Sequence, residues 1–139
     1  MPVADSFYII TVSGGTVVER DEDKVHMKDG EKDNPEQHWL VEHGDHANKV
    51  AFKNVKSGGY LRATSGSAYG KVDCGEKQWW IVEEGSSPGS YWWVWHWSCS
   101  GGELIWCCRL KCTDYDDAYL CNASGSYVNK NTVYVWPKQ

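Results

Sequence analysis

A tripeptide repeat constrains this chain more than any other feature of its sequence. Ser-Gly-Gly begins at Ser13, Ser57 and Ser100, so that successive copies lie 44 and 43 residues apart. Gly-Glu-Lys and Gln-x-Trp each occur twice, in the same order after the first two copies, at 30–32, 75–77, 37–39 and 78–80. A regular period of this size indicates a chain built from repeated supersecondary units.

The residues around each Ser-Gly-Gly predict a pair of short strands joined by a tight turn. Glycine reaches the positive φ that such turns need, and the flanking runs are rich in β-branched and aromatic residues. We expect strands before the turns at 7–12, 50–55 and 91–97, and after them at 16–19, 60–63 and 103–106. Third strands are expected at 25–28 and 70–74, and a fourth begins at each Gln-x-Trp.

The repeat and the strands together predict an all-β fold, namely a β-trefoil with three imperfect four-stranded repeats in a single domain. The repeats span about 6–46, 47–87 and 88–139. No window keeps a helical period. Closing the strands into a barrel with a threefold cap protects their edges. A β-sandwich remains the alternative fold.

Both Gln-x-Trp copies are interpreted as structural. The Trp of each copy can point into the core while the Gln bonds to the backbone of a loop. In the third repeat, Tyr134 is aligned with Trp39 and Trp80, and the segment 117–119 is a rival alignment.

The charge balance and the N-terminal sequence limit the partners and the location that we expect. The 14 basic and 19 acidic residues give a net charge of −5, without the basic stripe of a nucleic-acid-binding protein. Negative charge also disfavours anionic membranes, and no apolar run approaches the roughly 20 residues of a membrane helix. The N-terminal stretch lacks the basic and apolar regions of a secretory signal. We therefore expect a cytoplasmic protein, with secretion left open.

The residues that usually carry catalysis or bind metals do not form a known pattern. The sequence contains no phosphate loop. The cysteines at 107, 108 and 112 have no nearby His and no CxxC pair, so no zinc site is expected. They are interpreted as small buried residues or as members of one or two disulfides, with Cys107 and Cys108 on opposite faces of a strand. We expect no enzymatic activity, no cofactor and no metal.

The repeated residues resemble the ricin-B-type lectins, in particular the small cytoplasmic fungal ones. The middle repeat carries the clearest likeness, with Phe-Lys-Asn-Val-Lys-Ser-Gly-Gly-Tyr-Leu at 52–61 and Gln-Trp-Trp at 78–80. The first repeat is similar at 13–19 and 37–39. The resemblance implies a β-trefoil that binds glycans through shallow pockets, without catalysis or metal, often as a homodimer. A defence lectin is one such role.

The resemblance also implies which residues form a sugar pocket in the first repeat. The carboxylate that follows the hairpin turn is Glu19, with Asp21 close by, and it would accept hydrogen bonds from two sugar hydroxyls. His26 would stack on the sugar, and Asn34 would supply the amide. Gln37 would hold the loop that carries the pocket. A solvated acidic loop is the alternative interpretation of the carboxylates.

The corresponding pockets in the other two repeats are expected to be altered. Arg62 stands at the carboxylate position of the second repeat, and its guanidinium cannot accept a hydrogen bond. In the third repeat that position falls near Ile105 or Trp106. Only the first repeat is therefore expected to carry the family's pocket.

The segment 91–97, Tyr-Trp-Trp-Val-Trp-His-Trp, is the most aromatic part of the chain. Alternate residues of a strand share a face, so Trp92 and its even-numbered neighbours oppose Trp93, Trp95 and Trp97. We expect the latter three to form a core ladder and Trp92 to lie on the more exposed face. Tyr91, Trp92 and Trp79 are then candidates for an aromatic platform that binds a glycan or a partner. Burial of both faces is the alternative.

Two other functions remain open. A protease inhibitor on the same fold would act through one exposed loop, for which 85–90 and 115–118 are candidates. A protein that binds a non-sugar partner through degenerate sugar sites is the other possibility.

Overall fold

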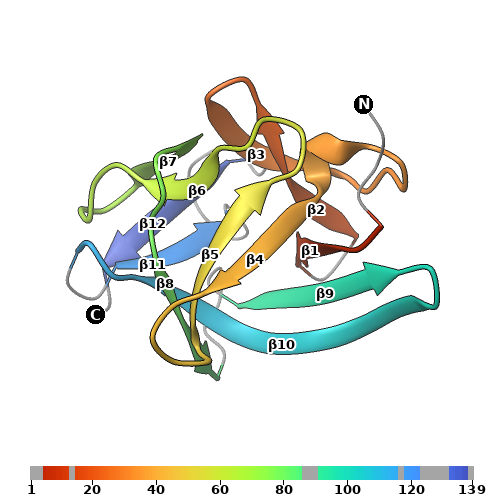
Figure 1. Cartoon of the computed structure of the whole chain (residues 1–139). Coiled ribbons are helices and arrows are strands. Elements are labelled where there is room, and N and C mark those ends of the chain that lie inside the picture. The colour runs from red at the N-terminus through yellow and green to blue at the C-terminus, as the bar shows by residue number, and fades with distance from the viewer. Residues whose placement is uncertain (1–4, 13–14, 86–90, 116–117, 123–131, 138–139) are drawn as a thin grey trace.

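The computed structural model describes residues 5–12, 15–85, 91–115, 118–122 and 132–137 (Figure 1). These residues form one antiparallel sheet of twelve strands with a short 3-10 turn, η1 (Pro35–Gln37). The prediction of an all-β fold is confirmed. The strands are β1 (Phe7–Thr11), β2 (Thr16–Asp21), β3 (Lys24–Asp29), β4 (Trp39–His43), β5 (Lys49–Asn54), β6 (Tyr60–Ala63), β7 (Gly70–Gly75), β8 (Trp80–Glu84), β9 (Trp92–Ser98), β10 (Gly101–Cys112), β11 (Ala118–Asn122) and β12 (Val133–Pro137).

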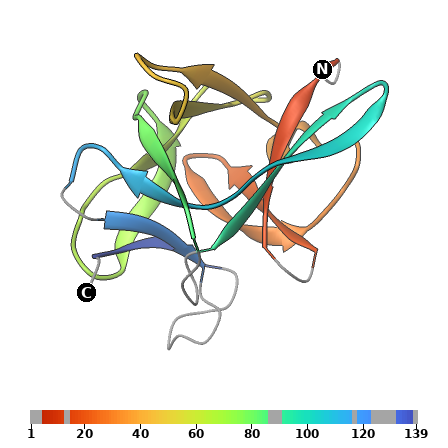
Figure 2. The same ribbon diagram turned by 90° about the horizontal axis from the view of Figure 1, so that it is seen from below.

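Six of the strands pair in a closed ring. The order is β1–β4–β5–β8–β10–β9, and β9 returns to β1 through five residue pairs. Strand β10 is long enough to serve two neighbours, because its first half pairs with β9 and its second half with β8. The tip of the β9–β10 hairpin projects to one side of the molecule in both ribbon views (Figures 1 and 2). Ring closure leaves both sides of each of these strands paired.

The other strands form three hairpins that are joined to one another. The hairpins are β2–β3, β6–β7 and β11–β12. Strand β7 pairs with β3 at Lys24 and Asp73 and with β12 at Tyr134 and Lys71. A single bridge between His26 and Thr132 joins the remaining two hairpins. A β-sandwich would need two separate sheets, whereas these pairings connect all twelve strands.

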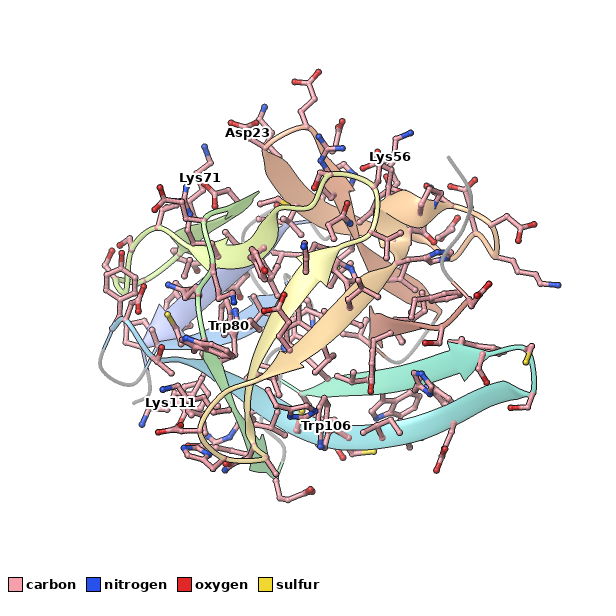
Figure 3. All side chains as sticks on the ribbon, in the orientation of Figure 1. Asp23, Lys56, Lys71, Trp80, Trp106 and Lys111 are labelled. Carbon is pink, nitrogen blue, oxygen red and sulfur yellow. The ribbon has the colours of Figure 1, made fainter. Side chains whose placement is uncertain are left out.

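Three fully buried tryptophans tie the ring to the hairpins. Trp39, Trp80 and Trp92 stand at the first positions of β4, β8 and β9, and Figure 3 shows Trp80 within the molecule. Each indole Nε1 donates to a backbone carbonyl in the first strand of one hairpin, at Val18, Leu61 and Leu120, over 3.2, 3.0 and 2.8 Å. A buried indole needs such an acceptor, because an unpaired N–H inside the core is costly.

These bonds contradict the predicted alignment of Tyr134 with Trp39 and Trp80. Trp92 makes the bond that corresponds to those of Trp39 and Trp80, whereas Tyr134 lies on β12 and packs with Cys121 in a separate small cluster. The predicted alignment of Tyr134 is therefore wrong. The rival segment 117–119 lies partly outside the described residues, and its Tyr119 bonds to Glu83.

The faces of the aromatic strand are the reverse of the prediction. Trp92 and Val94 are completely buried, whereas Trp93 and Trp95 are half-buried and Trp97 is 42% exposed. The expectation that Trp92 lies on the exposed face is wrong. The physical reason is ring closure, which turns the even-numbered residues of β9 inward beside Ile10 of β1.

The local predictions for turns and cysteines agree with the structure. Gly58, in the turn before β6, and Gly101, the first residue of β10, have positive φ of 76° and 112°. Gly15 does so as well, and 13–14 lie outside the described residues. All the cysteines are free, and Cys107 is half-buried beside a fully buried Cys108. The alternative of one or two disulfides is therefore wrong for this structure.

Candidate functional site

The β2–β3 hairpin brings two of the predicted site residues face to face. Glu19 of β2 and His26 of β3 are direct cross-strand partners, so their side chains leave the hairpin on the same face. His26 Nε2 lies 3.2 Å from Glu19 Oε2. The Glu19 side chain is only 12% exposed and that of His26 25%.

The turn after β3 supplies two amides to the same carboxylate. Asn34 Nδ2 and Gln37 Nε2 both donate to Glu19 Oε1, over 2.9 and 3.0 Å. With His26, three side-chain nitrogens surround one carboxylate. We call Glu19, His26, Asn34 and Gln37 the Glu19 cradle. The structure thus brings these four predicted residues together.

Local structure fixes both amides in place. Asn34 caps η1, its Oδ1 accepting from the backbone N–H of Glu36 over 3.0 Å, which leaves Nδ2 free to reach Glu19. Pro35 begins the turn with a preset φ. Gln37 is 1% exposed, and its Oε1 accepts from the backbone N–H of Glu31 over 2.7 Å. Its Nε2 also donates to the carbonyl of Asp29.

The hydrogen bonds of the cradle determine what more it can accept. A carboxylate oxygen carries two lone pairs, and Asn34 and Gln37 use both of those on Glu19 Oε1. Among the described residues, only His26 contacts Oε2, so one lone pair there remains for a ligand. The cradle can therefore accept one charge-assisted hydrogen bond from a hydroxyl or N–H group. The predicted pair of such bonds would require one of the amides to move.

The other predicted residues lie outside the cradle. Asp21 is exposed at the end of β2, where it pairs with Lys24, and makes no hydrogen bond to the cradle. Tyr91 precedes β9 and is half-buried, and its hydrogen bond with Cys107 raises the pKa of its phenol. Trp92 is buried and cannot touch a ligand. Trp79 belongs to a different cluster, described next.

Trp79 takes part in a cluster that sequence reasoning missed. The Lys77 ammonium lies 5.3 Å from the ring centroids of both Tyr60 and Trp79 and 2.7 Å from Glu42 Oε1. The Tyr60 hydroxyl donates to Glu42 Oε2 over 2.6 Å. Lys77, and then Tyr60, lower the pKa of the Glu42 carboxyl through these bonds. The protein's own lysine thus occupies the space between two aromatic rings and a carboxylate.

The positions that correspond to Glu19 in the other hairpins have different chemistry. Each follows the residue that accepts from a buried tryptophan, which makes them Arg62 and Cys121. Arg62 forms a two-bond ion pair with Asp73, over 2.9 and 2.8 Å. Arg62 was predicted to offer no hydrogen-bond acceptor at this position, and its pairing with Asp73 is consistent with that prediction. The predicted third position near Ile105 or Trp106 is wrong, because both lie on β10 of the ring.

No known protein family matches the chain, and no curated protein matches it. Among the described residues, no three His, Cys, Asp or Glu side chains gather as they would around a metal ion. Within the same ranges no helix is long and apolar enough to cross a membrane.

Proposed function

We propose that the chain is a β-trefoil lectin whose third repeat is permuted. The support is the matching role of Trp39, Trp80 and Trp92, each of which starts a ring strand and bonds to the first strand of a hairpin. In the first two repeats the hairpin precedes its tryptophan, whereas in the third it follows. The closed six-stranded ring and the three joined hairpins have the strand count of a trefoil barrel and its cap.

The observation that carries the proposed function is the Glu19 cradle. A carboxylate oriented by three side-chain nitrogens is preorganised to accept a hydrogen bond from a hydroxyl group. Sugars carry hydroxyl groups on adjacent ring carbons. His26 is one-quarter exposed beside the free lone pair of Oε2, so its ring is accessible to the same ligand. Burial of all but 12% of Glu19 strengthens any hydrogen bond made there.

The proposal includes one glycan site of this type per chain. Arg62 is neutralised by Asp73 and provides no acceptor, and Cys121 is a buried thiol whose pKa burial raises to about 12. Neither can replace the carboxylate. A homodimer, a cytoplasmic location and a role in defence remain predictions, and the inhibitor segments 85–90 and 115–118 lie largely outside the described residues.

A glycan array with labelled protein, followed by calorimetry on the best glycan, tests the proposal. Glu19→Gln keeps the shape but removes the charged acceptor, and we expect affinity to fall about tenfold or more, since such bonds contribute about 1.5–3 kcal/mol. Asp21→Asn is the matched control, because it removes one carboxylate from the same strand outside the cradle. Unchanged affinity of a folded Glu19→Gln protein, or no binding to any glycan, would sink the proposal.

A further inference from the structure

A groove of about 800 Å³ lies beside the aromatic strand and borders the Glu19 cradle, since Gln37 is one of its lining residues. Phe7 and Ile9 of β1, Val17 of β2 and Trp97 near the end of β9 line it, as does the segment 30–33. The hairpin tip, β1 and the turn after β3 all lie on the right side of Figure 1. This volume is within the range of small-molecule sites.

The apolar part of the groove is formed by cross-strand neighbours. Phe7 pairs with Trp97 and Ile9 with Trp95, so these side chains share the face of the ring opposite to buried Ile10 and Val94. This is the face that was predicted to meet the core. Its large side chains therefore remain available to a ligand, with Trp97 42% exposed.

Two contacts fix the aromatic side chains before any ligand arrives. The Phe7 ring stacks on the buried His38 ring, with centroids 3.6 Å apart and planes 9° from parallel. The Trp97 indole lies against Gly102, where an added Cβ would come within 2.7 Å of the ring. The absence of a side chain at Gly102 thus allows the indole to pack against the backbone of the hairpin. A rigid apolar surface of this kind loses little entropy on binding.

The charged residues of the groove are mostly acidic. Asp5, Glu31 and Asp33 line it, against a single cation, Lys32. Asp5 and Asp33 make no hydrogen bond or ion pair with any described residue, so their charges remain available. Burial lowers the pKa of His38 beneath Phe7, which keeps that imidazole neutral at pH 7 and adds no opposing charge.

From these features we infer that the groove binds a lipophilic ammonium ion, that is, an amine with an aromatic or aliphatic body. The body would cover Phe7, Ile9 and Trp97, and the ammonium would meet the carboxylates and the face of the indole. A free sugar would leave this apolar surface poorly covered, and an organic anion would be repelled. The groove adjoins the proposed glycan site at Gln37, but the inference does not depend on glycan binding.

Three probes with one body and different heads test the inference: phenylbutylammonium, phenylbutanol and phenylbutyrate. We expect calorimetry to rank them in that order, with the ammonium bound about tenfold or more tightly than the carboxylate, because charge-assisted contacts are the strong ones. Indole fluorescence should change on addition of the ammonium. Equal affinity for all three, or no binding of the ammonium, overturns the inference.

Two variants with matched controls locate the site. Trp97→Ala should weaken all three probes, whereas Leu104→Ala, equally exposed on the same hairpin, should not. Asp33→Asn should reduce the preference for ammonium and leave phenylbutanol unchanged, whereas Asp45→Asn, an exposed carboxylate outside the groove, should have no effect. Unaltered binding by Trp97→Ala overturns the inference. Trp97→Ala should leave glycan affinity unchanged. A failure of the ammonium inference can therefore be told apart from a failure of the glycan proposal, which Glu19→Gln tests.

Discussion

The indole Nε1 of Trp92 donates a hydrogen bond to the carbonyl oxygen of Leu120, 28 residues further along the chain, over 2.8 Å. Trp39 and Trp80 make the same kind of bond, but to carbonyls 21 and 19 residues earlier. The sense of the connection is thus reversed in the last third of the chain. The tryptophan strand there comes before the hairpin that it joins to the ring.

Replacing Trp92 should destabilise the protein in two separable steps. Trp92→Phe keeps most of the apolar volume but leaves the buried Leu120 carbonyl without its donor, at a cost of about 1–3 kcal/mol. Trp92→Ala also creates a cavity, for a total of about 3–5 kcal/mol. Urea unfolding followed by circular dichroism measures both. Trp97→Ala is the control and should cost far less, because Trp97 is 42% exposed. Equal losses at Trp92 and Trp97 would contradict the described faces of β9.

The two glutamines of the Gln-x-Trp copies should separate stability from binding. Gln78 bonds to both backbone groups of Ala63, over 2.7 and 3.3 Å, so Gln78→Ala should cost about 1–3 kcal/mol and leave glycan affinity unchanged. Gln37 also bonds to Glu19. Gln37→Ala should therefore lower both the free energy of unfolding and glycan affinity. Calorimetry measures glycan affinity and thermal melts measure stability in both variants. A loss of glycan affinity in Gln78→Ala alone would contradict the placement of Gln37 in the glycan site.

The buried thiols should make the protein less stable in alkali. Burial raises the pKa of Cys108 and Cys121 from 9.0 to about 12. A raised pKa contributes stability that is complete below pH 9 and is lost as pH rises toward 12, because only the unfolded thiols ionise in that window. Each thiol contributes a slope of about 1.4 kcal/mol per pH unit. Cys108→Ala should reduce the measured slope by about that amount, and an unchanged slope would show that Cys108 ionises normally when folded.

Glu42 should titrate at a lower pH than an ordinary glutamate. Its hydrogen bond with Lys77, and then that with Tyr60, lowers the pKa of the carboxyl. The contribution of Glu42 to stability is therefore present above the unfolded pKa and is lost as pH falls through the folded value. An NMR titration of the Glu42 side chain follows this directly. Lys77→Met should raise the midpoint more than Tyr60→Phe does, and the reverse order would assign the main effect to the phenol.

Local signals in the sequence were enough to predict most strands and turns. Glycines at 58 and 101 adopt the positive φ that a tight turn requires, and each Gln-x-Trp begins a strand at Trp39 or Trp80. These features depend on a few neighbouring residues. The same holds for much of the cradle, because Glu19 and His26 belong to one hairpin and Asn34 and Gln37 to the turn that follows it.

Only the tertiary structure decided the role of Trp92 and the buried face of the aromatic strand. An alignment in sequence order paired Tyr134 with the two earlier tryptophans, because it cannot detect that Trp92 comes before the hairpin to which it bonds. Which face of β9 is buried depends on its pairing with β1, through partners such as Ile10 and Val94, more than eighty residues apart. Alternation along a strand defines two faces, but only closure of the ring determines which of them meets the core.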